Sequence, residues 1–439
     1  MTDVIRRAVV VPHPGAVPRR PSHALARPVQ NWRKPLNTTT DDTTTGAIPT
    51  QRAVHTQHHE HGDDHFLVTG LLDTAGDSTF LRTKGYTSDE GDVRVSQSLV
   101  RRWGLRRGDE ITGCAKPPVE ERKHARLDHV HSVNDLPPER LSGRPEFTDL
   151  PPLHPKERLR LASDAEDLTG RVIDLVMPTG KGQRALISAP PKAGKTSALR
   201  AIARGIGANH PECHVMLVLV GERPEEVTDL RRSVRAEVAA ATFDQSPQEQ
   251  IAVAELALER ARRLVELGRD VVILLDSLTR LGRAYNLAAP TSGRVLSGGV
   301  SASALHPPKR FLGSARNVEG GGSLTIFATA LVETGSTGDT VIHEEYRGTG
   351  NAELKLDRSL ADRRVHPAVD IRQSSTRRDE LLMSPAEQSA TRVLRRVLQM
   401  REGDRGIDVL LDGLRKTSTN AEFLHRLTQT TPVRRAIAA

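Results

Sequence analysis

Two patterns of apolar and polar positions divide the chain. Between residues 66 and 133, short runs alternate apolar with polar residues, and Gly, Asp and Pro separate them: HFLVTGLLD, STFLRTKG, DVRVSQSLV, DEITGCAK and ARLDHVHSV. Several short strands at this spacing predict a small β-barrel. After residue 160 the apolar runs become almost continuous, as in RALISA, HVMLVLVGE, DVVILLDS and SLTIFATAL. Such runs are typical of parallel strands that helices cover on both faces.

Helix signals alternate with these buried strands. The run SPQEQIAVAELALERARRLVELG places Ser246 and Glu249 as a capping box, with a proline at the first helical position and a glycine at the end. The run SPAEQSATRVLRRVLQ, from Ser384, opens in the same way. The sequence therefore predicts a doubly wound α/β domain over residues 161–439 that ends in helices.

The other segments differ in composition. Residues 134–160 are rich in proline and are interpreted as a linker. In the segment 1–65, the first 40 residues carry seven Lys or Arg, one acid and six prolines, and the Thr-rich run NTTTDDTTTG follows. This composition cannot bury a core, so we expect a disordered basic arm, which either attracts nucleic acid or is a passive tail. The histidines of residues 55–65 lie in a segment that we expect to be flexible, without a predicted helix to hold ligands on one face, which favours a solvated segment over a metal site.

The amino-acid composition limits the classes of protein to which this chain can belong. The 439 residues include 63 Lys or Arg against 55 acids, so the chain is basic enough for a polyanion partner, although a merely soluble basic surface remains an equal interpretation. The two cysteines, Cys114 and Cys213, exclude a disulfide framework and a clustered cysteine metal site. Because the sequence has no run of about 18 apolar residues and no signal peptide, we expect a cytoplasmic protein without membrane contact.

The stretch APPKAGKT, residues 189–196, indicates a phosphate-binding loop. It follows a predicted strand, precedes a predicted helix and matches G-x-x-x-x-G-K-[ST] except that Ala189 replaces the first glycine. Gly194 allows close backbone approach, Lys195 can reach terminal phosphates, and the hydroxyl of Thr196 can ligate Mg²⁺. We therefore predict that this loop binds a nucleotide.

Two acids follow predicted strands of the same sheet. Asp276 ends DVVILLD and can hold Mg²⁺ through water, and Glu222 ends HVMLVLVGE and can orient and deprotonate an attacking water. Either acid alone would be read as an ordinary charge at a strand end. Together with the phosphate loop they predict hydrolysis of a nucleoside triphosphate.

Longer motifs give a resemblance. The segments GKGQRALISAPPKAGKT, ERPEEVTDLRR, VVILLDSLTRLGRAYN, SGRVLSGGVSASALHPPKRFLGSARNVEGGGSLTIFATAL, EEYRGTGNAELKLDR and RRVHPAVDIRQSSTRRDELL resemble the Rho family of bacterial transcription termination factors, which are ring-forming RNA helicases. The match runs from about residue 66 to the C-terminal region, and that family also has Ala at the first phosphate-loop position. The resemblance implies a RecA-type ATPase domain with a mostly parallel sheet, preceded by an OB-like (cold-shock-like) barrel. It also implies a homohexamer that uses ATP and Mg²⁺, binds RNA and acts on RNA polymerase elongation complexes.

The resemblance also implies roles for individual residues. Glu222 and Lys195 are expected to be catalytic, with Arg377 as an arginine finger for the neighbouring subunit's ATP and Arg364 assisting it. Mg²⁺ is expected at Thr196 and Asp276. The expected ATP contacts are Gly180, Lys181, Gly182, Gln183, Arg184, Ala185, Lys192, Ala193, Gly194, Lys195, Thr196, Ser197 and Arg223.

RNA contacts are expected in two places. Those on the barrel are Phe80, Leu81, Arg82, Asp92, Arg94, Arg122, Lys123 and His124. Those in the central channel are Arg294, Val295, Leu296, Ser297, Gly298, Gly299 and Thr337. The sequence departs from the family at Ser78, Arg94 and residues 122–124, where aromatics are usual, and at Thr337, where Lys or Arg is expected. From the lost aromatics we expect weaker base selectivity, and from Thr337 a weaker grip on RNA. The sequence also has Gly221 in place of an acid, which removes a charge beside Glu222 and is expected to alter its setting.

Three hypotheses follow from the sequence. The first is an ATP-dependent RNA translocase that releases transcripts from RNA polymerase, and the nearly intact ATPase motifs favour it. The second is a divergent paralogue that acts as an RNA-binding regulator, which the lost aromatics and Thr337 favour. The third is a rotary ATPase of proton transport or protein export, against which the RNA-facing loops and the barrel count.

Overall fold

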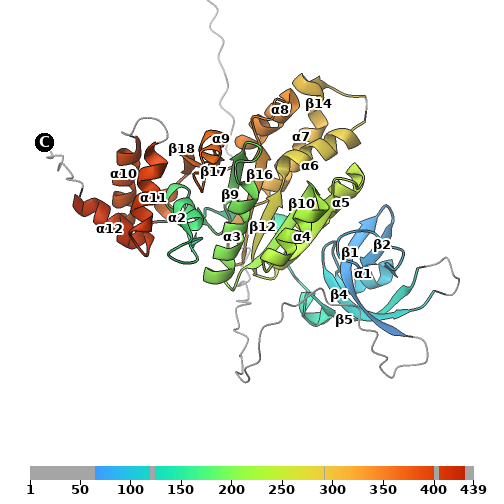
Figure 1. Cartoon of the computed structure of the whole chain (residues 1–439). Coiled ribbons are helices and arrows are strands. Elements are labelled where there is room, and N and C mark those ends of the chain that lie inside the picture. The colour runs from blue at the N-terminus through green and yellow to red at the C-terminus, as the bar shows by residue number, and fades with distance from the viewer. Residues whose placement is uncertain (1–64, 119–123, 291, 400–404, 431–439) are drawn as a thin grey trace, which may run out of the picture. The chain divides into compact units, whose positions relative to one another are not determined.

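The computed structural model describes residues 65–118, 124–290, 292–399 and 405–430, which form a β-barrel followed by an α/β domain (Figure 1). The basic arm predicted for residues 1–65 lies outside the described residues except for His65. Arg122 and Lys123, two of the predicted RNA contacts, also lie outside them.

The barrel is closed, with strands in the order β1-β2-β3-β5-β4, and helix α1 lies between β3 and β4 along the chain. Alternate residues of these strands face inward, and Leu72, Leu81, Ile111 and Val133 are fully buried. The alternating pattern thus predicted the barrel correctly. The elements are β1 Phe66–Ala75, β2 Ser78–Arg82, β3 Val93–Val95, α1 Gln97–Trp103, β4 Glu110–Lys116 and β5 Arg126–Val133.

The α/β domain is built on a sheet with the order β11-β10-β12-β16-β9-β17-β18. Neighbours from β11 to β17 are parallel, and only β18 runs antiparallel to β17 within this order. The carboxyl ends of β9, β10, β12 and β16 therefore meet at one edge. These strands are β9 Arg184–Ala189, β10 His214–Glu222, β11 Glu237–Thr242, β12 Asp270–Asp276, β16 Ser323–Leu331, β17 Ala352–Leu356 and β18 Val369–Thr376.

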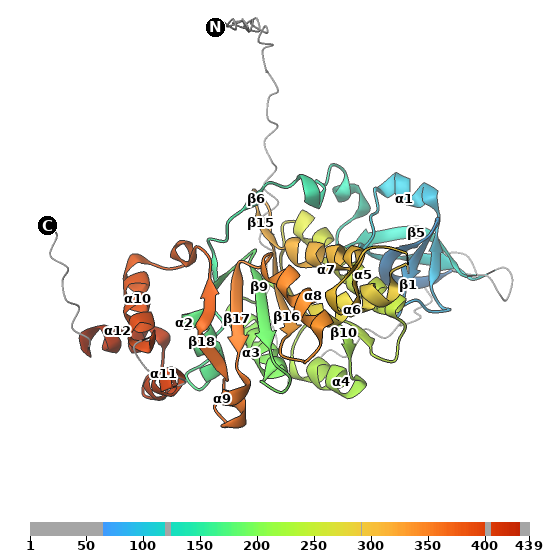
Figure 2. The same ribbon diagram turned by 90° about the horizontal axis from the view of Figure 1, so that it is seen from above.

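Helices cover both faces of this sheet (Figure 2). Successive strand residues alternate between two cores, so that Leu217 and Leu219 pack on one side while Met216 and Val218 pack on the other. The first core includes α2 Leu168–Val176, α3 Lys195–Asn209, α4 Pro224–Ser233, α9 Arg358–Asp362, α10 Pro385–Gln399, α11 Arg405–Arg415 and α12 Asn420–Thr430. The second includes α5 Pro247–Glu266, α6 Leu278–Ala288, α7 Ala302–Gly313 and α8 Thr337–Arg347. The predicted doubly wound α/β fold is confirmed, and the capping box of Ser246 and Glu249 is formed at the start of α5.

The segment interpreted as a linker contains short elements of its own. Phe147 is buried against the α/β domain, and β6 pairs with β15 while β7 pairs with β8. The remaining short elements are η1 Pro138–Leu141, η2 Phe147–Asp149, β6 Pro152–Leu153, β7 Arg158–Leu159, β8 Thr179–Gly180, β13 Val295–Leu296, η3 Ser297–Gly299, β14 Val300–Ser301, β15 Arg316–Val318 and η4 Asp379–Leu381. Among the residues that the structure describes, none of the helices combines the length and the apolar character needed to cross a bilayer.

Candidate functional site

The phosphate loop joins the end of β9 to the start of α3. Ala189 is the last residue of β9 and its side chain is fully buried in the core, so this position is ordinary strand and does not require glycine. Gly194 caps α3 with a φ of +96°, a conformation that residues with a side chain rarely adopt. The loop therefore keeps its glycine at the position where the backbone demands one.

Lys195 lies between two carboxylates at the carboxyl edge of the sheet. Its Nζ is 2.8 Å from Oε1 of Glu222 and 2.5 Å from Oδ1 of Asp276. Burial lowers the pKa of Lys195, but the charges of Asp276 and Glu222 outweigh this effect, and the pKa is raised. The lysine is therefore cationic at neutral pH, as a phosphate ligand must be.

One of the two carboxylate oxygens of Asp276 is unpaired among the described residues. Its Oδ1 accepts a hydrogen bond of 2.8 Å from Thr329, whereas its Oδ2 is buried and has no hydrogen-bond partner among the described residues. Burial is the main cause that raises the pKa of this carboxyl group. The raised pKa indicates that an uncompensated negative charge on Asp276 is unfavourable in this buried position. An unpaired carboxylate oxygen beside a phosphate loop, with Thr196 next to Lys195 in the first turn of α3, fits a Mg²⁺ site.

Glu222 is almost fully buried at the end of β10, where Arg280 of α6 contacts it. Nη2 of Arg280 lies 3.2 Å from Oε2 of Glu222, and Nη1 donates to the carbonyl of Gly221. Gly221 has a φ of +65° at a register shift between β10 and β11. Sequence reasoning missed Arg280, although its place one turn after Asp276 in a helix could have indicated it.

Helix α6 connects this site to the predicted channel loops. Arg280 contacts Glu222, and three residues later Nε of Arg283 donates to Oδ1 of Asp339 at 2.8 Å. Three residues further, Nδ2 of Asn286 donates to the carbonyl of Gly299 at 3.2 Å. One helix thus contacts the carboxylate of the nucleotide site and both loops.

The two predicted channel loops pack against each other. Gly298 has a φ of +74°, and a Cβ on it would lie 2.4 Å from the backbone N of Gly338. Arg294, Val295 and Thr337 are exposed around this contact. Arg294 is thus a cation on this surface, whereas Thr337 contributes none.

Residues 180–185, predicted as nucleotide contacts, lie at the opposite end of β9 from the phosphate loop. The six residues of β9 span about 20 Å. Nζ of Lys181 is committed to three carboxylates, at 2.5 Å from Glu157, 3.0 Å from Glu212 and 2.8 Å from Asp270. The structure therefore does not bring these residues to the phosphate loop of their own subunit, and Lys181 is part of a structural ion cluster.

Arg377 and Arg364 lie at opposite ends of β18. The backbone of Arg377 donates to the carbonyl of Asn351, whose side chain also binds Gln183, so Arg377 lies at the edge away from its own phosphate loop. Arg364 follows α9, and Arg358 of that helix donates to the carbonyl of Pro191 in the phosphate loop. The exposed Arg377 is thus not placed to contact a nucleotide on the phosphate loop of its own chain, and the structure does not bring Arg364 next to Arg377.

On the barrel, part of the predicted RNA site is exposed and part is internal. Phe80 pairs with Arg94 across β2 and β3, and its ring lies 5.1 Å from the ring of His124 in an edge-to-face arrangement. Arg126, which sequence reasoning missed, is exposed and pairs with Arg94 across β3 and β5. These four residues form a mixed aromatic and basic surface.

Three other predicted RNA contacts lie beneath this surface. Leu81 is fully buried in the barrel core, and Arg82 is buried between Asp73 at 2.7 Å and Asp92 at 2.6 Å. The guanidinium of Arg82 also lies 5.6 Å from the centre of the Phe80 ring. These three side chains support the surface of Phe80, Arg94, His124 and Arg126 from inside the barrel. In this conformation they are too buried to contact an RNA base.

Comparisons with known proteins cover both domains. Residues 68–139 match the model of the Rho termination factor RNA-binding domain, and residues 170–376 match that of the ATP synthase alpha/beta family nucleotide-binding domain. A solved ATPase from the type III secretion system of pathogenic bacteria has a TM-score of 0.53 at 22% identity, covering 64% of this chain and 88% of that one. That likeness concerns the fold alone.

Curated relatives named transcription termination factor Rho match most of the chain. The protein of Mycobacterium tuberculosis is 59% identical over 83% of this chain and 62% of its own length. That of Streptosporangium roseum is 52% identical over 89% of this chain and its entire length. That of Pseudomonas aeruginosa is 51% identical over 83% of this chain and 88% of its own length. Although the chain spans only about 62% of the length of the mycobacterial relatives, it belongs to the Rho family.

Proposed function

We propose that the protein is an RNA-dependent ATPase that moves along RNA as a homohexamer and releases transcripts from RNA polymerase. The observation that carries this proposal is the position of α6, which contacts Glu222 at one end and the loops of Gly299 and Asp339 further along. A change at the γ-phosphate would alter the partners of Glu222. Because α6 is one rigid helix, such a change would also move the RNA loops.

The residues of the nucleotide site suit hydrolysis of ATP. Thr196 and Asp276 would hold Mg²⁺, which when bound neutralises charge on the phosphates. Lys195 would bind the terminal phosphate in place of its present carboxylate partners. Glu222, then relieved of the lysine and still oriented by Arg280, would accept the proton of the attacking water.

The arginine finger would come from another subunit. Arg377 is exposed at the sheet edge opposite its own phosphate loop, so it is free to approach the nucleotide of a neighbour. Hydrolysis would then depend on assembly of the ring. Contacts of residues 180–185 with a nucleotide also stay predictions, and they would have to be made in the assembled ring. The assisting role of Arg364 stays a prediction as well.

RNA would bind first on the barrel and then in the channel. The rings of Phe80 and His124 offer stacking surfaces, and Arg94 and Arg126 offer cations to the backbone. In the channel, Arg294 would contact phosphates. The departures at Ser78, Arg94 and Thr337 concern RNA affinity and leave the ATPase residues intact, so they are compatible with a working ATPase. The barrel, with its own RNA-binding family match, counts against a rotary ATPase.

Release of labelled transcripts from stalled elongation complexes tests this proposal. The wild-type protein should release transcripts only when ATP is present, and Lys195→Met should abolish release. Arg204→Met, an exposed cation on α3 outside the phosphate loop, is the matched control and should leave release unchanged. RNA-stimulated hydrolysis without any release would contradict the termination role and indicate a motor with another task.

A further inference from the structure

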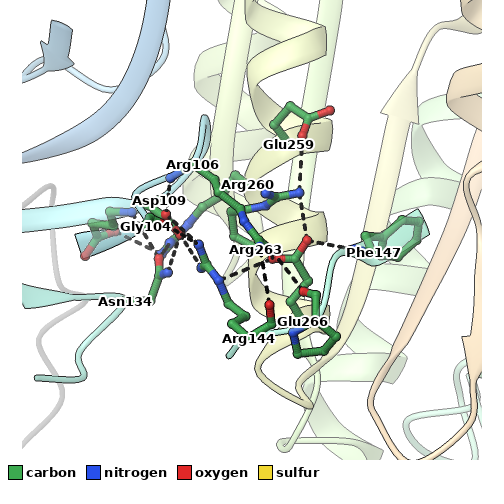
Figure 3. Close-up of polar contacts among 12 residues, drawn as sticks. Gly104, Arg106, Asp109, Asn134, Arg144, Phe147, Glu259, Arg260, Arg263 and Glu266 are labelled. Atoms are coloured by element: carbon green, nitrogen blue, oxygen red, sulfur yellow. Dashed lines mark hydrogen bonds and ion pairs between the residues drawn. The ribbon is translucent and has the colours of Figure 1, made fainter. Parts of the chain in front are cut away.

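Buried charges fasten the barrel to helix α5 of the α/β domain (Figure 3). Asp109 of the barrel accepts two hydrogen bonds from Arg144, at 2.7 and 2.9 Å, and one of 2.7 Å from Asn134. Glu266 of α5 lies 3.5 Å from Nε of Arg144 and 2.8 Å from Nη2 of Arg263. All five side chains are buried, so breaking this network would leave uncompensated charges.

The backbones of the two domains also meet closely. Gly108 has a φ of +88°, and a Cβ on it would lie 2.4 Å from the backbone N of Arg260 in α5. Arg260 in turn lies 3.0 Å from Oε2 of Glu110, the first residue of β4. A barrel held in this way has little freedom to slide on α5. A movement of barrel side chains at this interface would therefore also move the side chains of α5 that they contact.

A second line of polar contacts leaves the RNA face of the barrel beside this network. Asp73, which is buried in β1, holds Arg82 with one carboxylate oxygen and Arg107 with the other, at 2.7 and 2.8 Å. Nη1 of Arg107 lies 3.3 Å from Oε2 of Glu255 in α5. The hydroxyl of Tyr285 donates to Oε1 of the same glutamate at 2.6 Å.

The two ends of this line, Arg82 and Tyr285, lie next to the candidate RNA site and in the helix of the candidate nucleotide site. Arg82 lies against the ring of Phe80, which is the stacking surface for RNA on the barrel. Tyr285 belongs to α6, the helix whose Arg280 contacts Glu222. Burial raises the pKa of Tyr285, so its hydroxyl keeps the proton that it donates to Glu255. Hydrogen bonds and ion pairs thus run from Arg82 to Tyr285, and the backbone of α6 connects Tyr285 to Arg280 at the nucleotide site.

We propose that Arg107 is a positioning residue through which RNA on the barrel and nucleotide on the phosphate loop influence each other, by way of Glu255 and Tyr285. The proposal rests on the proposed function. RNA stacked on Phe80 would fix Arg82 and Asp73, and Arg107 would convey that position to α6 and to Arg280. Arg107 suits this role because its planar guanidinium contacts two carboxylates from different nitrogens, which a lysine cannot do with the same geometry.

Thermodynamic reciprocity gives the test. If occupancy of the barrel affects the nucleotide site, a nucleotide must change the affinity of the barrel by the same factor. The probe is a labelled tetranucleotide of cytidine, too short to span the barrel and the channel, and it is titrated onto the full chain with and without a non-hydrolysable ATP analogue and Mg²⁺. The wild-type protein should show a ratio of the two dissociation constants of at least about fivefold.

The variants separate coupling from folding. Arg107→Met and Tyr285→Phe should each reduce this ratio to below about twofold, and the double variant should lower it no further, since both act on one line. Arg102→Met removes the same charge from the barrel at a side chain that lies over Trp103, and it should keep the wild-type ratio. Thermal unfolding should show that all variants are folded. It also tests the alternative, because a merely structural role of Arg107 would lower stability and leave the ratio of dissociation constants unchanged.

The outcomes also distinguish this inference from the proposed function. A wild-type ratio of one, or an unchanged ratio in Arg107→Met, would overturn the link even if RNA still stimulates hydrolysis. Failure of the tetranucleotide to bind the wild-type protein, together with hydrolysis that ignores RNA, would instead overturn the proposed function and the link with it.

Discussion

Glu222 is held by charges on both sides, with Lys195 at 2.8 Å from one oxygen and Arg280 at 3.2 Å from the other. These contacts fix the direction of the carboxylate toward the phosphate loop. The acid at the end of β10 is thus oriented by side chains of α3 and α6, and it is itself almost fully buried.

Replacing this carboxylate should separate binding from hydrolysis. Glu222→Gln keeps the size and shape of the side chain but removes the base, so it should retain ATP binding and lose hydrolysis by at least about 100-fold. Steady-state hydrolysis and equilibrium binding of a labelled nucleotide measure the two effects. Glu225→Gln, an exposed acid in the first turn of α4, is the control and should behave like the wild type. Near-normal turnover in Glu222→Gln would assign the base to another residue.

Glu237 at the barrel interface predicts a dependence of stability on pH. Burial raises its pKa, but the hydrogen bond from His214 and the charge of Arg260 outweigh that effect and lower the pKa to about 2 from 4.5. A carboxyl group whose pKa is lower in the folded state stabilises the protein above its unfolded pKa, and this stabilisation is lost as the pH falls from about 4.5 toward 2.

The wild-type protein should therefore exceed Glu237→Gln in free energy of unfolding near neutral pH, by up to about 3 kcal/mol. The difference should shrink as the pH falls below 4.5. Chemical denaturation of both proteins at a series of pH values measures it. A difference that stays constant down to the acid limit of folding would show that the charge of Glu237 does not stabilise the fold.

At the scale of residues, the sequence predicts those site residues whose role follows from their place at or after a strand. Lys195, Glu222 and Asp276 could be predicted because each ends a strand or follows one, and parallel strands bring their ends together. Arg82 was expected to contact RNA because of the resemblance to the family, whereas in the structure Asp73 and Asp92 hold its side chain inside the barrel. Arg107 could not be found, because its partners Asp73 and Glu255 lie far away in sequence. Arg280 was missed although its place one turn after Asp276 was a usable signal.

At the scale of elements, the two channel loops form one unit. Gly298 and Gly299 are adjacent and both have positive φ, at +74° and +75°. Only Gly298 is crowded, since a Cβ there would strike Gly338 in the other loop, whereas a Cβ on Gly299 would have no atom within 4 Å among the described residues. The pair thus allows contact between the loops to be tested apart from backbone strain.

Gly298→Ala should separate the two loops and sharply reduce stimulation of ATP hydrolysis by RNA. Gly299→Ala carries a comparable backbone strain of about 1 kcal/mol without the clash, so it should cause a much smaller loss. Hydrolysis at saturating RNA and without RNA measures both. Equal losses in the two variants would mean that backbone conformation matters and contact between the loops does not.

The elements themselves could be predicted from their periodicity. Alternation gave the barrel strands, continuous apolar runs gave the parallel sheet, and the capping box gave the start of α5 at Pro247. The segment 134–160 was interpreted as a linker because of its prolines, and yet its side chains Arg144 and Phe147 are buried. Composition does not show this, because these two side chains are buried by elements outside their own segment.

At the scale of the whole molecule, the basic composition of the segment before the barrel gives a prediction about RNA binding. Residues 1–40 carry seven cations against one acid, and they lie outside the described residues. If these cations contact RNA phosphates, deletion of residues 1–45 should flatten the dependence of RNA affinity on salt. Each lost contact would lower the slope of log K against log salt concentration by about 0.7. Filter binding at several salt concentrations tests this, and an unchanged slope would make the segment a passive tail.

Steady-state ATP hydrolysis by the purified full chain, without RNA, with poly(C) and with RNA of mixed sequence, tests the central claim most directly. Glu222→Gln serves as the blank. The account predicts strong stimulation by either RNA, since α6 joins the RNA loops to Glu222, and only a modest preference for poly(C), since the barrel lacks several aromatics. Tight binding of RNA without stimulated turnover would contradict the account, because the RNA loops would then be disconnected from the nucleotide site.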